Sequence, residues 1–284
     1  MKRHEFAAFV APSVTIMLLL MVVPLMITIG LSFSRFSFGQ TPTWHGVTNY
    51  VNVLTDDRFW NSVRWTLTYI VFTLPVQLVL GYVIATFLTQ ARFLRGAFVS
   101  GYLLPFIVTP VVCTLVFSWL FKDKWGFYSY LFAQVGLDIK WYASEIPMKT
   151  LLIMHGIWSV TPFVILVMYA GLQAMPYEPI EAAIMDGATT WQRIRYVVIP
   201  HLMPLITFVT MINIMDAYRV FDSVYVMTRG LFKTESIMYY NYEVAFGSQN
   251  LGRASAVSVL MVLGIFVVLI PLLRRTYKEQ RETR

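Results

Sequence analysis

Three ionisable side chains lie close together in a stretch of the sequence that is otherwise apolar. Asp216, Arg219 and Asp222 follow one another at intervals of three residues, which places them on roughly one flank if the stretch is helical. Arg219 can pair with either carboxylate and leave the other free to accept hydrogen bonds. Inserting such a group into a membrane helix costs about 2.5–3.5 kcal/mol, so it normally faces a cavity or a partner. The alternative is a buried ion pair that holds helices together.

Aromatic and amide side chains accompany this charged group. Asn213 lies one turn before Asp216, and Tyr218 and Tyr225 lie one heptad apart. A sugar site needs aromatic rings that stack on C–H surfaces and planar polar groups that hold hydroxyls, and the segment supplies both. We therefore predict that these residues line a substrate cavity. If no carboxylate cancelled the charge of Arg219, the cavity would also suit a substrate that bears a sulfonate, phosphate or carboxylate.

His155 and Trp158 could form a second wall of this cavity. They lie three residues apart, and therefore on one face of a predicted helix. A helix–helix contact in which a carbonyl satisfies the histidine is an equally good interpretation. No serine–histidine–acid set, pair of carboxylates or Cys-x-x-Cys motif has the context for catalysis or metal binding. The sequence thus predicts a chain that is not an enzyme and that binds no metal and no cofactor.

The composition is that of a polytopic membrane protein. Hydrophobic residues make up 57% and charged residues 13% of the 284 residues, against roughly 25% charged in soluble domains. We predict an all-α fold, a single transmembrane domain over 1–284, with six helices long enough for a hydrocarbon core of about 30 Å. The six spans are expected near 7–33, 65–89, 97–121, 148–172, 203–227 and 254–273.

The charge distribution orients the chain in the membrane. An even number of spans puts both termini on one side, and the segments on that side are short and dense in Lys and Arg, which favours a cytoplasmic location. The net charge of +7 then reflects membrane topology, and no nucleic-acid partner is expected. On the outer side, Asp56 and Asp57 are expected to form a solvated turn.

The longest predicted cytoplasmic loop, at 177–204, has the pattern of two short helices joined by a bend. Ile180, Ala183 and Ile184 share one face of the first helix. Gly187 allows the chain to turn because it lacks a Cβ atom. Pro200 is expected to end the second helix, since the residue before a proline leaves the α region. Two such helices with one face free to dock suit a coupling element.

The residues of this loop carry a family resemblance. The loop resembles the EAA loop of ABC-importer permeases in Glu181, Ala182, Ala183, Asp186, Gly187, Ala188, Pro200 and Pro204. The approach to the loop is similar to that of the carbohydrate-uptake branch in Trp158, Pro162, Gly171, Gln173 and Pro176. In that family the loop docks into a groove on a cytoplasmic ATPase subunit. The resemblance implies the same coupling role for these loop residues here, and a type I importer fold.

The resemblance also implies a set of partners. They are a second homologous permease, two copies of a cytoplasmic ABC ATPase that uses ATP and Mg²⁺, an external solute-binding protein, and membrane lipid. The implied location is the bacterial inner membrane, with both termini cytoplasmic. The implied function is import of a sugar or sugar derivative by alternating access, and Arg219 would allow an anionic one. The pattern continues in Phe221-Asp222 and Val226-Met227-Thr228, whereas Arg229-Gly230-Leu231 replaces the family's glycines and proline.

Two other interpretations stay open at this point. An ion-coupled secondary transporter could use the membrane ionisables as a proton relay, and it predicts uptake that does not depend on ATP. An ABC-importer permease for a non-sugar solute is the nearer alternative, although the fifth and sixth spans match that pattern less well.

Overall fold

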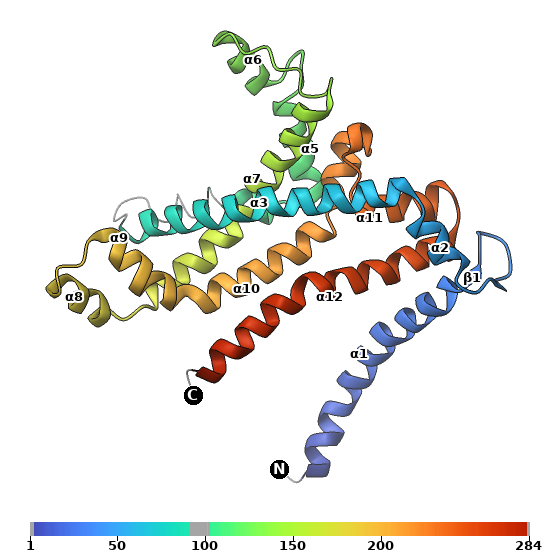
Figure 1. Cartoon of the computed structure of the whole chain (residues 1–284), viewed down its shortest axis with the longest axis horizontal. Coiled ribbons are helices and arrows are strands. Elements are labelled where there is room, and N and C mark those ends of the chain that lie inside the picture. The colour runs from blue at the N-terminus through green and yellow to red at the C-terminus, as the bar shows by residue number, and fades with distance from the viewer. Residues whose placement is uncertain (1–2, 91–100, 102, 283–284) are drawn as a thin grey trace. The chain divides into compact units, whose positions relative to one another are not determined.

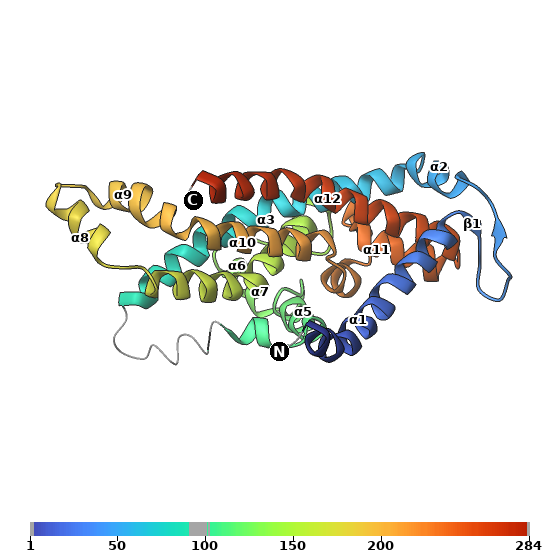
Figure 2. The ribbon, with the colours of Figure 1, turned by 90° about the horizontal axis from the view of Figure 1, so that it is seen from below.

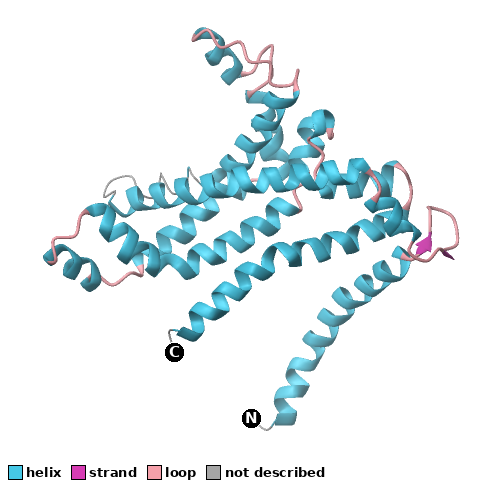
Figure 3. Cartoon of the chain, in the orientation of Figure 1, coloured by secondary structure: helices cyan, strands magenta, loops and turns pink. Residues whose placement is uncertain are grey.

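Helices make up most of the computed structural model, which describes residues 3–90, 101 and 103–282 (Figure 3). The chain divides into two compact units, one formed by Met1–Trp60 with Tyr240–Phe266 and the other by Asn61–Tyr239 with Val267–Arg284. Among the described residues, five helices are long and apolar enough to cross a membrane, which confirms the predicted all-α polytopic fold. They are Phe9–Ser32, Asp57–Gln90, Glu145–Gln173, Thr190–Tyr218 and Leu251–Arg274.

The predicted span at 97–121 lies partly outside the described residues, at 97–100 and 102. In its described part, 103–107 are helical, 108 and 109 interrupt the helix, and α5 (Pro110–Leu120) follows. Thr109 has extended backbone angles, φ −55 and ψ 137, as the residue before a proline favours. Pro110 then begins α5, where its missing N–H leaves no hydrogen bond unmade.

The first unit is tied together by backbone and amide hydrogen bonds. It contains α1 (Arg3–Ser32), the antiparallel strands β1 (Ser34–Arg35) and β2 (Thr43–Trp44), α2 (Thr48–Leu54), the π-helix η4 (Glu243–Gly247) and the first part of α12 (Leu251–Glu282). Nδ2 of the buried Asn49 donates to the carbonyls of Ser32 and Ser34, both at 2.9 Å. The Gly252 N–H donates to the Phe36 carbonyl at 3.0 Å. These bonds hold α2 and α12 against the end of α1.

Asp56 takes part in a polar network, so the expectation of a solvated turn was wrong for this residue. The hydroxyl of Tyr240 donates to its carboxylate at 2.8 Å, and Arg253 forms an ion pair with the same oxygen. Partial burial acts to raise the pKa of the Asp56 carboxyl, but these partners and the Arg58 backbone N–H hold that pKa below its usual value. This network could not be predicted from the sequence, because Tyr240 and Arg253 lie 184 and 197 residues from Asp56 along the chain.

The second unit packs its helices closely at glycines. It contains most of α3 (Asp57–Gln90), α5, α6 (Phe127–Gln134), α7 (Glu145–Gln173), α8 (Glu178–Met185), α9 (Thr190–Arg193), the π-helix η1 (Ile194–Val198), α10 (Ile199–Tyr218), the π-helix η2 (Val224–Thr228), the 3₁₀ turn η3 (Leu231–Lys233) and the first half of α11 (Ile237–Tyr242). A Cβ atom at Gly81 of α3 would lie 2.8 Å from Cβ of Val164 in α7, and one at Gly171 of α7 would lie 2.7 Å from Leu202 of α10. Small residues therefore let α3, α7 and α10 run side by side (Figures 1 and 2).

The fifth span ends earlier than the predicted 203–227. α10 stops at Tyr218, Arg219 leaves the helical region with φ −102 and ψ 19, and a second short helical segment begins at Asp222. The hydroxyl of Ser236 donates to the Val220 carbonyl at 2.6 Å. Because this side chain donates to a carbonyl inside the break, the interruption does not leave that partly buried acceptor without a partner.

Pro200 does not end a helix, and this prediction was wrong. The helical run continues from Thr190 to Tyr218, and Ile199 keeps helical angles of φ −62 and ψ −45. The five residues before it, Ile194–Val198, form the π-helix η1. In a π-helical turn the hydrogen bonds join residues i and i+5. We attribute the continuation of the helix through Pro200 to this wider turn.

Candidate functional site

A polar cavity of about 380 Å³ lies in the second unit, among α3, α5, α7 and the break that follows α10. Its lining includes five of the eight side chains predicted for a substrate cavity, namely His155, Asn213, Asp216, Arg219 and Asp222. Sequence reasoning missed six further polar or reactive side chains on the same wall, namely Tyr69, Gln77, Cys113, Thr114, Ser159 and Ser223. Residues far apart in the sequence are thus brought to one cavity by the packing of α3, α5, α7 and α10.

The charged residues of the polar cavity form one ion pair and leave one carboxylate. Nη2 of Arg219 lies 2.6 Å from Oδ1 of Asp216, and the two side chains are 72% and 44% exposed. The structure gives Asp222 no ion-pair or hydrogen-bond partner among the described residues. Asp222 instead begins the helical segment 222–228, where the helix dipole favours a negative charge. Arg219 is therefore not an uncancelled positive charge, which was the condition for expecting an anionic substrate.

Two amide side chains connect three helices on the cavity wall. Nδ2 of Asn213 in α10 donates to Oε1 of Gln77 in α3 at 3.0 Å, and Nε2 of Gln77 donates to the Gly156 carbonyl of α7, also at 3.0 Å. Gln77 and Asn213 are both buried, 4% and 3% exposed. The signal that could have identified Gln77 is an amide inside an apolar span, since such a group needs a partner.

His155 joins α7 to α5 as well as lining the polar cavity. Its Nε2 lies 3.2 Å from the Thr114 hydroxyl, which itself donates to the Pro110 carbonyl at 2.8 Å. His155 therefore both lines the cavity and forms a helix–helix contact, so the two interpretations do not exclude each other. The sequence anticipated a carbonyl partner, and the structure places the Thr114 side chain there.

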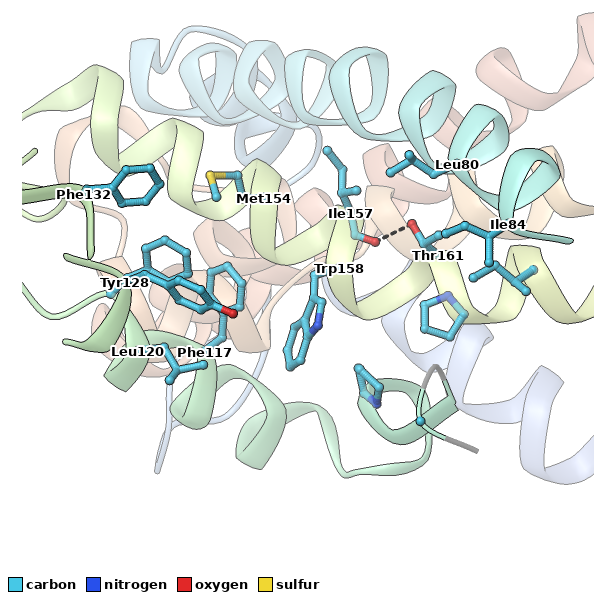
Figure 4. Close-up of a pocket in the computed structure, with 15 residues that line it drawn as sticks. Leu80, Ile84, Phe117, Leu120, Tyr128, Phe132, Met154, Ile157, Trp158 and Thr161 are labelled. Carbon is cyan, nitrogen blue, oxygen red and sulfur yellow. Dashed lines mark hydrogen bonds between the residues drawn. The ribbon is translucent and has the colours of Figure 1, made fainter. Parts of the chain in front are cut away.

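The other three predicted side chains lie away from the polar cavity. Tyr218 is buried and 7% exposed, and Tyr225 is 41% exposed with its ring 5.3 Å from that of Phe221. The break after α10 separates these two tyrosines, so they form no stripe on one helix. Trp158 lines a separate apolar cleft of about 820 Å³, where its ring lies 5.3 Å from that of Phe117 (Figure 4).

The loop at 177–204 begins with a helix that ends in a Schellman motif. α8 is followed by Gly187 in the left-handed region, with φ +75. The Gly187 N–H donates to the Ile184 carbonyl at 3.0 Å, and the Ala188 N–H donates to the Ala183 carbonyl at 2.9 Å. These two bonds satisfy the last carbonyls of α8. The predicted bend at Gly187 is confirmed, with Ala183 and Ala188 as the other partners in the turn.

The second helix of the loop begins with a capping box. The Thr189 N–H donates to Oε1 of Gln192 at 2.7 Å, and the Gln192 N–H donates to the Thr189 hydroxyl at 3.3 Å. This reciprocal pair fixes the start of α9. α8 and α9 together protrude at one end of the second unit (Figures 1 and 2).

The protruding loop exposes both acidic and apolar side chains. Glu181 and Asp186 are exposed, and the structure leaves no residue of α8 buried. Met185, Trp191 and Tyr196 are 87%, 69% and 72% exposed. Contiguous exposed apolar side chains with a polar rim are typical of a protein–protein contact. The loop therefore has the chemistry of a docking surface.

Comparison with known proteins identifies the family. A family model described as "Binding-protein-dependent transport system inner membrane component" matches residues 58–275. The inner membrane ABC transporter permease protein YcjO of Escherichia coli is 32% identical over 272 residues, 92% of this chain and 90% of YcjO. The trehalose transport system permease protein SugA of Mycobacterium tuberculosis is 29% identical over 263 residues, 92% of this chain and 84% of SugA.

The fold is shared with a solved ABC importer. A bacterial ABC transporter involved in the import of the acidic polysaccharide alginate matches with a TM-score of 0.81 and 21% identity, over 99% of this chain and 96% of that chain. At this identity the likeness concerns the fold alone. The family match covers most of the sequence and agrees with the resemblance found in the loop at 177–204. The chain belongs to the family of inner membrane components of binding-protein-dependent transport systems, as a multi-pass ABC-transporter permease.

Proposed function

We propose that this chain is the permease subunit of an ATP-driven importer that moves a sugar or sugar derivative by alternating access. The observation that carries the proposal is the polar cavity beside the interrupted fifth span. Interrupted membrane helices commonly form the binding sites of transporters, because their freed polar groups face a cavity. The trehalose transport assigned to SugA supports the sugar class.

The proposed partners would bind at the polar cavity and at the loop 177–204. A second homologous permease would form a heterodimer with this chain and supply the other wall of the pathway. Two copies of a cytoplasmic ABC ATPase would bind the loop at 177–204, and an external binding protein would deliver the substrate. This chain would bind no metal and no cofactor of its own, because ATP and Mg²⁺ would be used by the ATPase.

The loop residues would have distinct roles in coupling. Glu181, Ala182 and Asp186 would meet the ATPase, since they lie exposed on or directly after α8. Ala183, Gly187 and Ala188 would hold the turn between the two helices, and Pro200 would lie where η1 passes into α10. With this loop in the cytoplasm, both termini would also be cytoplasmic.

Purification and reconstitution test this proposal. The tagged chain, extracted gently from native membranes, is expected to bring an ATPase and a second permease in stoichiometric amounts. In liposomes, with the binding protein outside, the complex is expected to take up the binding protein's sugar only when ATP is present. A chain that purifies alone and transports without ATP, with uptake abolished by an uncoupler, would instead be an ion-coupled secondary transporter.

A further inference from the structure

Three polar atoms of residues that line the polar cavity have no hydrogen-bond partner in the described part of the chain. They are Nδ1 of His155, Oδ1 of Asn213 and Oγ of Ser223, and the three residues are 7%, 3% and 2% exposed. A buried polar group left unsatisfied costs about 1–3 kcal/mol. Because these atoms come from separate elements and meet at one cavity, they indicate a place where a ligand supplies the missing hydrogen bonds.

The amide network determines what Asn213 offers to that ligand. Gln77 contacts the Gly156 carbonyl, which can only accept, so the atom of Gln77 at this contact is Nε2. Its Oε1 then faces Asn213, which must donate through Nδ2. The nitrogen and oxygen positions of both side-chain amides, Gln77 and Asn213, are thus fixed by contacts within the protein. The remaining atom, Oδ1 of Asn213, is an acceptor.

The same reasoning assigns the free nitrogen of His155. The Thr114 hydroxyl has a single hydrogen, which it donates to the Pro110 carbonyl. With that hydrogen on the Pro110 carbonyl, the 3.2 Å contact between Thr114 and His155 is made by an N–H on Nε2. A buried imidazole with no anionic partner is costly to charge, so it carries only this one proton. Nδ1 is then a second free acceptor.

The charged side chains on the cavity wall also favour a ligand that donates hydrogen bonds. Among the residues that the structure describes, three charged side chains line the cavity. Two of them, Asp216 and Arg219, cancel in an ion pair, and Asp222 contributes one further negative charge. Carboxylates accept hydrogen bonds and donate none when ionised. The described part of this wall is thus rich in acceptors, and its charged side chains sum to −1.

We propose that the polar cavity selects substrates that present several hydroxyl or ammonium donors and carry no net negative charge. Neutral saccharides and amino sugars meet this requirement, whereas uronic acids and sugar phosphates do not. An anionic group here would face Asp222, and the described lining residues offer it no cation outside the Asp216–Arg219 ion pair. Rejection by an unpaired charge is a known source of specificity. The proposal rests on the proposed function and names the substrate class of the same site.

Cys113 allows this preference to be measured directly, because it is the only cysteine of the chain and lines the same cavity. In the full importer complex, with other subunits free of cysteine, its rates of modification by a cationic and an anionic methanethiosulfonate reagent of similar size are compared. Each rate is divided by that of free cysteine. The cationic reagent is expected to react roughly tenfold faster, the effect of one nearby unit charge at intermediate dielectric.

Matched variants connect the preference to Asp222. Asp222→Asn is expected to bring the ratio of rates close to one, while Asp138→Asn, which removes an exposed loop carboxylate, leaves it unchanged. An equal ratio in the unmodified chain, or faster reaction of the anionic reagent, overturns the proposal. If Cys113 reacts with neither reagent, Ser159→Cys in a Cys113→Ala chain places the thiol elsewhere on the same wall and decides the question.

The two proposals fail in different ways. A complex that moves no sugar with ATP contradicts the proposed function, whatever the ratio of reagent rates. A complex whose main substrate is a uronic acid or a sugar phosphate contradicts the charge preference and leaves the proposed function intact.

Discussion

At the scale of single residues, the role of each polar side chain is set by partners that lie far away in the sequence. Asp216, Arg219 and Asp222 could be singled out because charges are conspicuous in an apolar run. The partner of Gln77 could not be identified in this way, because Asn213 lies 136 residues further on. The choice of Asp216 over Asp222 as the partner of Arg219 also depends on the backbone break, which no spacing rule reveals.

Removal of the Gln77 amide should destabilise the transporter. In Gln77→Leu, Nδ2 of the buried Asn213 loses its acceptor and the Gly156 carbonyl loses one of its donors, at a cost of about 1–3 kcal/mol. We expect a lower thermal unfolding midpoint of the purified complex and a lower uptake rate. Gln90→Leu is the control, since Gln90 is exposed at the end of α3. A Gln77→Leu complex as stable and active as the unmodified one would show that the amide network does not support the cavity.

At the scale of elements, helix ends were predictable where the signal is local. The bend at Gly187 follows from the absence of a Cβ atom, and the structure places this residue at φ +75. The end of α10 was not predictable, because the Val220 carbonyl is satisfied by the side chain of Ser236, 16 residues later. The prediction that Pro200 ends a helix failed for a related reason. The rule that the residue before a proline leaves the α region takes no account of a preceding π-helical turn.

Gly187→Pro should separate transport from ATP hydrolysis. Proline fixes φ near −65° and has no N–H, so it is incompatible with φ +75 and removes the bond to the Ile184 carbonyl. We expect a complex that assembles but whose ATPase activity no longer responds to loaded binding protein. Gly136→Pro is a matched control, because Gly136 has φ +80 and donates to the Ala133 carbonyl after α6. A normal ATPase response in Gly187→Pro would refute the coupling role of the loop.

Gly81→Ala should weaken the contact between α3 and α7. The new Cβ would lie 2.5 Å from Cγ1 and 2.8 Å from Cβ of Val164, a fully buried β-branched side chain that cannot rotate away. Overpacking of this kind costs about 1–3 kcal/mol, which the unfolding midpoint of the complex would report. Gly30→Ala, in α1 with nothing within 4 Å, should be neutral or stabilising. Equal midpoints for the two variants would contradict the close helix contact.

At the scale of the whole molecule, composition and length were enough to predict a polytopic all-α protein, and one loop was enough to predict its family. The first signal is a property of the whole sequence, and the second is contained in one short stretch. The polar cavity was only partly predictable, because it is assembled from α3, α5, α7 and the segment after α10. Residues such as Tyr218 and Tyr225, chosen on the assumption of one continuous helix, were placed elsewhere by the break.

The most direct measurement follows Cys113 during the ATPase cycle. The central claim is that the loop at 177–204 transmits ATP binding to the polar cavity, so the accessibility of Cys113 should change when ATP binds. In the intact complex, the rate of Cys113 modification is expected to change severalfold on addition of ATP with loaded binding protein, and to stay constant in Gly187→Pro. Identical rates under all conditions, in a complex that still hydrolyses ATP and imports sugar, would contradict the account.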